Sequence, residues 1–141
     1  GGKLSGILLE SSGAGGQVTA LAIGIGINLA GAPDAALVEP RALRPVSLLA
    51  ETGIALTQDE VLDALAASFD HWWRQFRDFG FATVRTAWLA RAAKLGETLT
   101  ARHGTSETTG RFDGIDEAGA LILTSPRGRV AIAAADIHFG G

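Results

Sequence analysis

Two runs near the N-terminus decide the fold class: Lys3-Leu-Ser-Gly-Ile-Leu-Leu-Glu10 and Gln17-Val-Thr-Ala-Leu-Ala-Ile-Gly-Ile-Gly-Ile-Asn28. Both are rich in aliphatic and β-branched residues, and the Ser- and Gly-rich segment 11–16 between them reads as a flexible link. They predict an antiparallel hairpin. The second run is apolar on both faces, which is typical of a strand covered on both sides. Two strands cannot bury their own faces, so we expect more sheet from outside this sequence.

Helical patterns follow the hairpin. Residues 30–56 hold three of the four prolines, and a short helix is predicted at Ser47–Thr52. A longer helix begins at Thr57-Gln-Asp-Glu60, a capping box in which the two end residues satisfy each other's amides. Apolar residues then recur at helical spacing as far as Phe76. Gly80 separates this helix from a second one, and we expect the pair to cover a sheet.

From Gly96 onward the hydrophobic period changes to two. Short strands are predicted at residues 97–102, 107–115, 120–124 and 130–134, with turn signals at 103–104, 113–114 and 126–128. A segment of this size suits a small five-stranded barrel. We therefore expect an α+β fold, with part of a helix-covered mixed sheet in residues 1–94 and a small β-barrel in residues 95–141.

Composition excludes several classes of protein. Apolar residues make up 47% of the 141 residues and charged residues 19%, so a packed core is feasible. A net charge of −3 argues against a nucleic-acid or anionic-membrane surface, and no apolar run is long enough to span a membrane. The absence of cysteine excludes disulfides and thiolate zinc sites and fits a cytoplasmic location. Because the chain lacks methionine, we expect it to be a fragment.

The residues with chemical potential lie in the hairpin. Lys3 supplies a cationic donor, while Gly6, Gly24 and Gly26 let a ligand approach the backbone, and Asn28 offers both a donor and an acceptor. Taken singly, each has a plainer interpretation: a solvated lysine, or glycines that serve packing. A dinucleotide-binding motif is excluded because its third glycine is missing. The three histidines lie on separate elements, so no metal site is predicted.

Three motifs in order resemble biotin–protein ligases: Lys3–Glu10, then Ile23-Gly-Ile-Gly-Ile-Asn28, then Gly114-Ile-Asp-x-x-Gly-x-Leu121. The first two resemble the second half of that family's catalytic domain, and the third resembles its C-terminal SH3-like domain. The resemblance covers nearly the whole chain. It implies the fold shared by class II synthetases and biotin–lipoate ligases, followed by an SH3-like barrel.

The resemblance also implies an activity. Such ligases make biotinyl-5′-AMP from biotin and ATP with Mg²⁺, then transfer biotin to a lysine of a biotin carboxyl carrier protein, as in acetyl-CoA carboxylase. By resemblance Lys3 is the catalytic residue and also binds biotin, together with Gly6, Ile7 and Leu8. Residues Gly26 and Asn28 are placed on the nucleotide side.

The family's Gly- and Arg-rich loop and its Trp-Pro-Asn-Asp segment do not occur in this chain. We therefore expect the 141 residues alone to be inactive. Near the C-terminus Asp136 keeps the family's acidic residue, but Gly140 stands where the family has an arginine, so the resemblance does not extend to an ATP contact there. Two alternatives stay open: a lipoate–protein ligase, and a non-catalytic module that docks a carrier domain or forms a homodimer.

Overall fold

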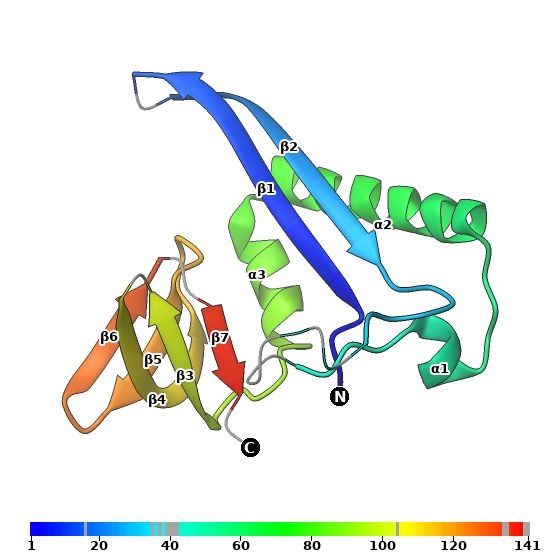
Figure 1. Ribbon diagram of the computed structural model, residues 1–141. Coiled ribbons are helices and arrows are strands. Elements are labelled where there is room, and N and C mark those ends of the chain that lie inside the picture. The colour runs from blue at the N-terminus through cyan, green and yellow to red at the C-terminus, as the bar shows by residue number, and fades with distance from the viewer. Residues whose placement is uncertain are drawn as a thin grey trace. The chain divides into compact units, whose positions relative to one another are not determined.

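The computed structural model describes residues 1–15, 17–34, 36, 38, 43–103, 105–133 and 136–139 (Figure 1). Within these ranges, two antiparallel sheets and three helices confirm the α+β class. By its internal contacts the chain divides into two compact units, Gly1–Asp63 and Ala64–Gly141, and each is described by itself. Of the positions named in the sequence predictions, Gly16, Pro40, Gly104, Ala134 and Gly140 lie outside the described residues.

The first unit is built on a long hairpin, drawn in blue in Figure 1. Strands β1 (Ser5–Ala14) and β2 (Gln17–Ile27) pair antiparallel, with a bulge between Ser12 and Gly13. The predicted flexible link at 11–16 is wrong as far as Ala14. The reason is that the ladder continues through these small residues, and the Thr19 hydroxyl donates to the Ser12 carbonyl at 3.1 Å.

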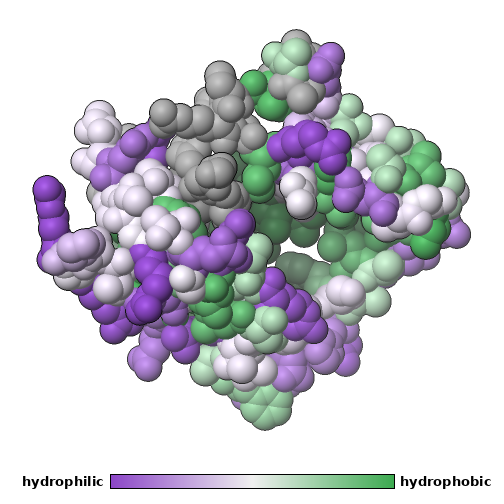
Figure 2. All heavy atoms as spheres, turned by 90° about the horizontal axis from the view of Figure 1, so that it is seen from below, coloured by the Kyte–Doolittle hydropathy of each residue, from purple (hydrophilic) through white to green (hydrophobic). Residues whose placement is uncertain are grey.

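Both faces of the hairpin carry exposed apolar side chains. Ile7 is 68% exposed, Leu8 63% and Val18 67%. Exposed apolar surface, drawn in green, is interspersed with hydrophilic surface in Figure 2. Among the described residues of Gly1–Asp63, nothing provides the two-sided burial expected for β2. The hairpin is therefore held by its hydrogen-bond ladder and by contacts at its base rather than by a hydrophobic core of its own.

The two N-terminal helices begin with side-chain caps. Helix α1 (Leu48–Thr52) confirms the predicted short helix, and its N-cap is Ser47, whose Oγ accepts from the Ala50 amide at 3.2 Å. Helix α2 spans Gln58–Phe79 and starts at the predicted capping box. There Glu60 Oε2 accepts from the Thr57 amide at 2.8 Å, and the Glu60 amide donates to Thr57 Oγ1 at 3.3 Å.

Helix α3 (Phe81–Leu89) follows directly after Gly80, whose φ of 76° breaks the helical path. Glycine adopts this positive φ without the steric cost that a Cβ atom imposes. The predicted break between the two helices is therefore confirmed at this position.

The second unit contains the predicted small barrel, a five-stranded antiparallel sheet in the order β6-β5-β4-β3-β7. The strands are β3 (Thr98–His103), β4 (Ser106–Ile115), β5 (Leu121–Ser125), β6 (Gly128–Ile132) and β7 (Asp136–Phe139). Four of them fall within a few residues of the predicted strands. The fifth, β7, pairs with β3 along Leu99–Arg102.

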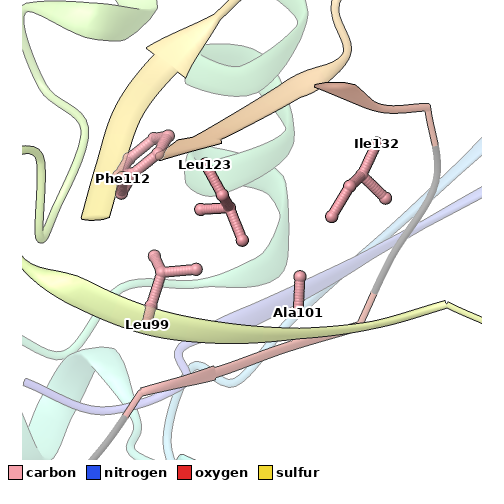
Figure 3. Packing of buried hydrophobic residues seen from close by; sticks show 5 residues of the cluster. All are labelled: Leu99, Ala101, Phe112, Leu123 and Ile132. Carbon is pink, nitrogen blue, oxygen red and sulfur yellow. The ribbon is translucent and has the colours of Figure 1, made fainter. Parts of the chain in front are cut away.

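Alternating side chains from four of these strands form the core of the barrel. Leu99, Ala101, Phe112, Leu123 and Ile132 are buried and point toward one another (Figure 3). The ring of Trp88 on α3 meets Phe112 edge to face, with centroids 6.3 Å apart. The period-two pattern of the sequence thus places one face of the sheet inside.

Leu123→Ala should destabilise the barrel strongly, because Leu123 is only 1% exposed and its removal leaves a cavity. We expect a loss of about 2–5 kcal/mol in the free energy of unfolding, measured by urea denaturation. The control is Val130→Ala on β6, which is 41% exposed and should cost less than about 1 kcal/mol. Equal losses in the two variants would contradict this core.

The capping box should make stability depend on pH. Hydrogen bonds from the Thr57 amide and hydroxyl lower the pKa of the Glu60 carboxyl below its ordinary value. The stabilisation is therefore complete above that ordinary value and is lost as the pH falls through the lowered one. Urea unfolding between about pH 7 and pH 3 should show a smaller acid loss in Glu60→Gln than in the parent chain. With Glu117→Gln as control, an unchanged loss in Glu60→Gln would refute the prediction.

Candidate functional site

The predicted site residue Lys3 lies at the base of the hairpin, just before β1. Its amide donates to the Arg44 carbonyl at 2.8 Å, and its carbonyl accepts from the Val46 amide at 3.1 Å. This forms an isolated parallel bridge between Lys3 and Pro45. The main chain is thus held on a segment about 40 residues away in sequence. The side chain is exposed and makes no ion pair within the described residues.

Asn28 lies at the end of β2 and joins the same segments. Its Nδ2 donates to the Val46 carbonyl at 2.9 Å and to the Lys3 carbonyl at 3.4 Å. Its own amide donates to the Leu4 carbonyl at 2.9 Å, and its carbonyl accepts from the Leu48 amide at 2.8 Å. Oδ1 accepts no hydrogen bond from the part of the chain that the structure describes. One polar face of this side chain is therefore committed to the backbone, and the other is available.

Sequence reasoning missed the segment that supports both residues. Val46 is 5% exposed and Ser47 is 3% exposed, and they are the buried residues of the described part of Gly1–Asp63. A Cβ atom on Gly2 would clash with a Val46 methyl and lie 2.7 Å from the Arg44 carbonyl oxygen, so this crossing requires glycine. The only sequence signal was a Pro-Val-Ser run, which indicates no tertiary contact.

The predicted glycines form a bare stretch on one face of the hairpin. Gly6 pairs directly with Gly26, and a Cβ at either position would meet nothing within 4 Å. The neighbouring pair on that face is Leu8 with Gly24, where a Cβ on Gly24 would lie 3.8 Å from Leu8. Because side chains alternate along a strand, Ile7 projects from the opposite face. The structure thus brings Gly6, Leu8 and Gly26 together and separates the Ile7 side chain from them.

This arrangement suits a ligand with an apolar body and an anionic group. Without Cβ atoms, the Gly6–Gly26 pair lets a flat or apolar group lie directly against the backbone. Three residues before Gly6, Lys3 supplies an ammonium group with three donors. Asn28 follows Gly26 by two residues and offers an acceptor. The cation, the bare face and the acceptor are therefore contributed by one short length of hairpin.

The Gly114–Leu121 motif has a structural explanation in the second unit. Asp116 Oδ1 accepts from the amides of Ala118 at 2.9 Å and Ala120 at 2.8 Å and so closes the turn before β5. The turn glycine Gly119 has φ 83°, and a Cβ there would lie 3.6 Å from the Phe81 ring. Arg85 Nε donates to the Ile115 carbonyl at 2.7 Å. The motif therefore fits the barrel against α3.

Asp113, on the surface of the described part of the barrel, has a shifted pKa. The Thr124 hydroxyl, 2.6 Å from Asp113 Oδ2, and the Arg111 guanidinium, 2.8 Å from Oδ1, hold the pKa of Asp113 below its ordinary value. These groups satisfy one another's hydrogen bonds on an exposed strand surface. Among the residues that the structure describes, no cluster of three or more acidic, histidine or cysteine side chains could hold a metal ion. None of the helices in these ranges is long and apolar enough to cross a membrane.

Comparison with known proteins points to one family. Residues 94–140 match the family described as "Biotin protein ligase C terminal domain". Over all 141 residues the chain is 59% identical to a biotin–[acetyl-CoA-carboxylase] ligase of Paracoccus denitrificans, and covers 59% of that protein. It is 30% identical to the bifunctional ligase/repressor BirA of Bacillus subtilis over 99% of the chain and 43% of that relative. The chain thus spans about half the length of these curated relatives.

Solved structures show the same fold. A biotin protein ligase crystal structure from Aquifex aeolicus aligns with 99% of this chain and 60% of its own, with a TM-score of 0.80 and 23% identity. The same organism's enzyme in complex with biotin and ATP aligns with 96% of this chain and 55% of its own, with a TM-score of 0.73. The resemblance drawn from the three sequence motifs is confirmed: along its whole length, this chain is similar to the part of biotin protein ligases that ends in their C-terminal domain.

Proposed function

We propose that this chain is the C-terminal part of a biotin–protein ligase, whose complete form activates biotin and attaches it to a carrier protein. The observation that supports this best is the Gly6–Gly26 pair, a backbone surface without Cβ atoms that follows the base of the hairpin, where Asn28 is hydrogen-bonded to Lys3. The 59% identity to a biotin–[acetyl-CoA-carboxylase] ligase agrees with it. Such a protein is an enzyme that acts in two steps.

In the first step a carboxylate oxygen of biotin attacks the α-phosphorus of ATP. The bond to the β-phosphate oxygen breaks, so that biotinyl-5′-AMP forms and pyrophosphate leaves. In the second step the amine of a carrier lysine attacks the acyl carbon; an amide forms, AMP leaves and the amine loses a proton. Mg²⁺ is proposed to enter with ATP as part of that substrate.

Each predicted residue has a role in this scheme. The Lys3 ammonium stabilises negative charge on the carboxylate and α-phosphate oxygens as they join. Biotin lies against the backbone of Gly6–Leu8, with the Leu8 side chain on the glycine face and Ile7 contributing main chain only. Gly26 and Asn28 face the nucleotide. Because Nδ2 of Asn28 donates to backbone carbonyls, its Oδ1 is the atom left to accept from an amino group such as that of adenine.

The domain division is proposed to fall near residue 94, with residues 1–94 in the catalytic domain and 95–141 forming the SH3-like domain. The start of the family match at residue 94 and the change to short strands at Thr98 support it. A biotin carboxyl carrier protein, of the kind found in acetyl-CoA carboxylase, is the proposed partner. We expect a cytoplasmic location, where ATP and such carboxylases meet.

A second candidate function is a non-catalytic module that docks a carrier domain or a second copy. The observation that favours it is the set of exposed apolar side chains on the hairpin, Ile7 and Val18 among them. This candidate needs neither Lys3 nor ATP. A measurement of activation chemistry therefore separates the two proposals.

Lys3→Ala should lower the rate of biotin-dependent exchange between ATP and pyrophosphate by about 10²–10³-fold, because it removes a cationic donor from the reacting oxygens. The assay uses the longer ligase proposed to carry this chain, with lipoate as the alternative acid. Lys94→Ala is the matched control, since the only other lysine of the chain pairs with Glu97 on the surface. The 141-residue chain alone should show no exchange.

Each outcome of this assay has a distinct meaning. Exchange that requires biotin and Lys3 supports the ligase. Exchange with lipoate in place of biotin would assign the protein to lipoate ligases. No exchange with either acid would overturn the enzyme proposal and leave the docking module. Undiminished exchange between ATP and pyrophosphate in Lys3→Ala would show that Lys3 is not a catalytic residue.

A further inference from the structure

We propose that Asn28 is a positioning residue for Lys3: its side-chain amide holds the main chain from which the lysine projects. This role rests on the proposed ligase function and is additional to a nucleotide contact through Oδ1. It uses the two N–H donors of the side chain, whereas a nucleotide contact would use the oxygen.

The main chain of Lys3 needs this support because it lies outside the hairpin ladder. Strand β1 begins at Ser5, and the first residue paired with β2 is that same serine, opposite Ile27. The direct partners of Lys3 are the Arg44 carbonyl and the Val46 amide. The position of Lys3 relative to the glycine face therefore depends on how the segment 44–46 is attached to the hairpin.

Asn28 makes that attachment. Nδ2 reaches the Val46 carbonyl at 2.9 Å and the Lys3 carbonyl at 3.4 Å, so one group links the main chain of Lys3 to the segment 44–46. The Asn28 carbonyl accepts from the Leu48 amide at 2.8 Å, which ties the start of α1 to the same point. The backbone amide of Asn28 also donates to the Leu4 carbonyl at 2.9 Å. Asn28 therefore ties the main chain around Lys3 both to the segment 44–46 and to the end of β2.

Asparagine is the residue type that this geometry requires. Two N–H donors on a short side chain are needed to meet two carbonyl oxygens, and aspartate offers none when ionised. A lysine side chain is flexible, so the part of Lys3 that the fold holds in place is its main chain. A shift of about 1 Å in a catalytic group can cost about 10²-fold in rate.

The test is a double-mutant cycle on the complete ligase, with Asn28→Asp and Lys3→Ala. Asn28→Asp removes both donors and keeps an acceptor oxygen for the nucleotide. We expect kcat for biotin-dependent exchange to fall about 10–100-fold, with KM for ATP changed less than about threefold. In the Lys3→Ala background the same substitution should cost less than about threefold, because there is no lysine left to position.

Thr19→Val is the matched control. It removes a hydrogen bond from a side chain to the backbone of the same hairpin, from Thr19 to the Ser12 carbonyl, at the end far from Lys3. It should leave kcat and KM unchanged. Losses that multiply in the Asn28→Asp, Lys3→Ala double variant, or a loss confined to KM for ATP, would overturn the proposal.

A measurement on the unaltered protein decides the matter if Asn28→Asp does not fold. The side-chain NH₂ protons of Asn28, the only asparagine in this chain, should exchange with solvent at least about tenfold more slowly than those of the exposed Gln58. If the side-chain protons of Asn28 exchanged with solvent as fast as those of Gln58, the positioning role would be refuted. A complete protein that shows no exchange between ATP and pyrophosphate would instead refute the ligase proposal, and the proton-exchange result would still report on the Asn28 geometry.

Discussion

The hydrogen bonds of Asn28 are the constraint on which the first unit depends. They join the approach to β1, the end of β2, the segment before α1 and the start of that helix. In this unit only Val46 and Ser47 are buried among the described residues, so apolar burial contributes little to the placement of these segments. Directional hydrogen bonds fix the placement of these segments instead. The same bonds hold the main chain of Lys3 at the base of the hairpin that carries the Gly6–Gly26 pair.

The two units are stabilised in different ways. In the barrel, alternation along the strands puts Leu99, Phe112 and Leu123 in a shared core, and the hydrophobic effect favours a single arrangement. In the hairpin, the ladder is long but the apolar side chains on both faces are exposed. A surface of this kind is the reason a docking role stays a rival to catalysis, since exposed apolar area favours contact with another surface.

The motifs that mark the family do different physical work. Gly114 near the end of β4 and the turn made by Asp116 and Gly119 lie against α3, and these residues are recognisable because backbone geometry restricts which residues can stand there. The residues proposed for chemistry, Lys3 and Asn28, lie in the other unit. A strong family signature in this chain is therefore evidence of fold, whereas the proposed reaction depends on a separate, less restrictive set of residues.

Local patterns in the sequence determined the hairpin, the capping box at Thr57, the break at Gly80 and the short strands of the barrel, because each follows from the conformations open to a few neighbouring residues. The extent of β1 was misjudged because glycine and serine are compatible with both a link and a ladder. Tertiary structure alone decided that Gly6 lies opposite Gly26, that Ile7 faces away, and that Asn28 bonds to Lys3 and Val46. Those facts depend on strand register and on hydrogen bonds between residues up to 25 positions apart, which no local propensity encodes.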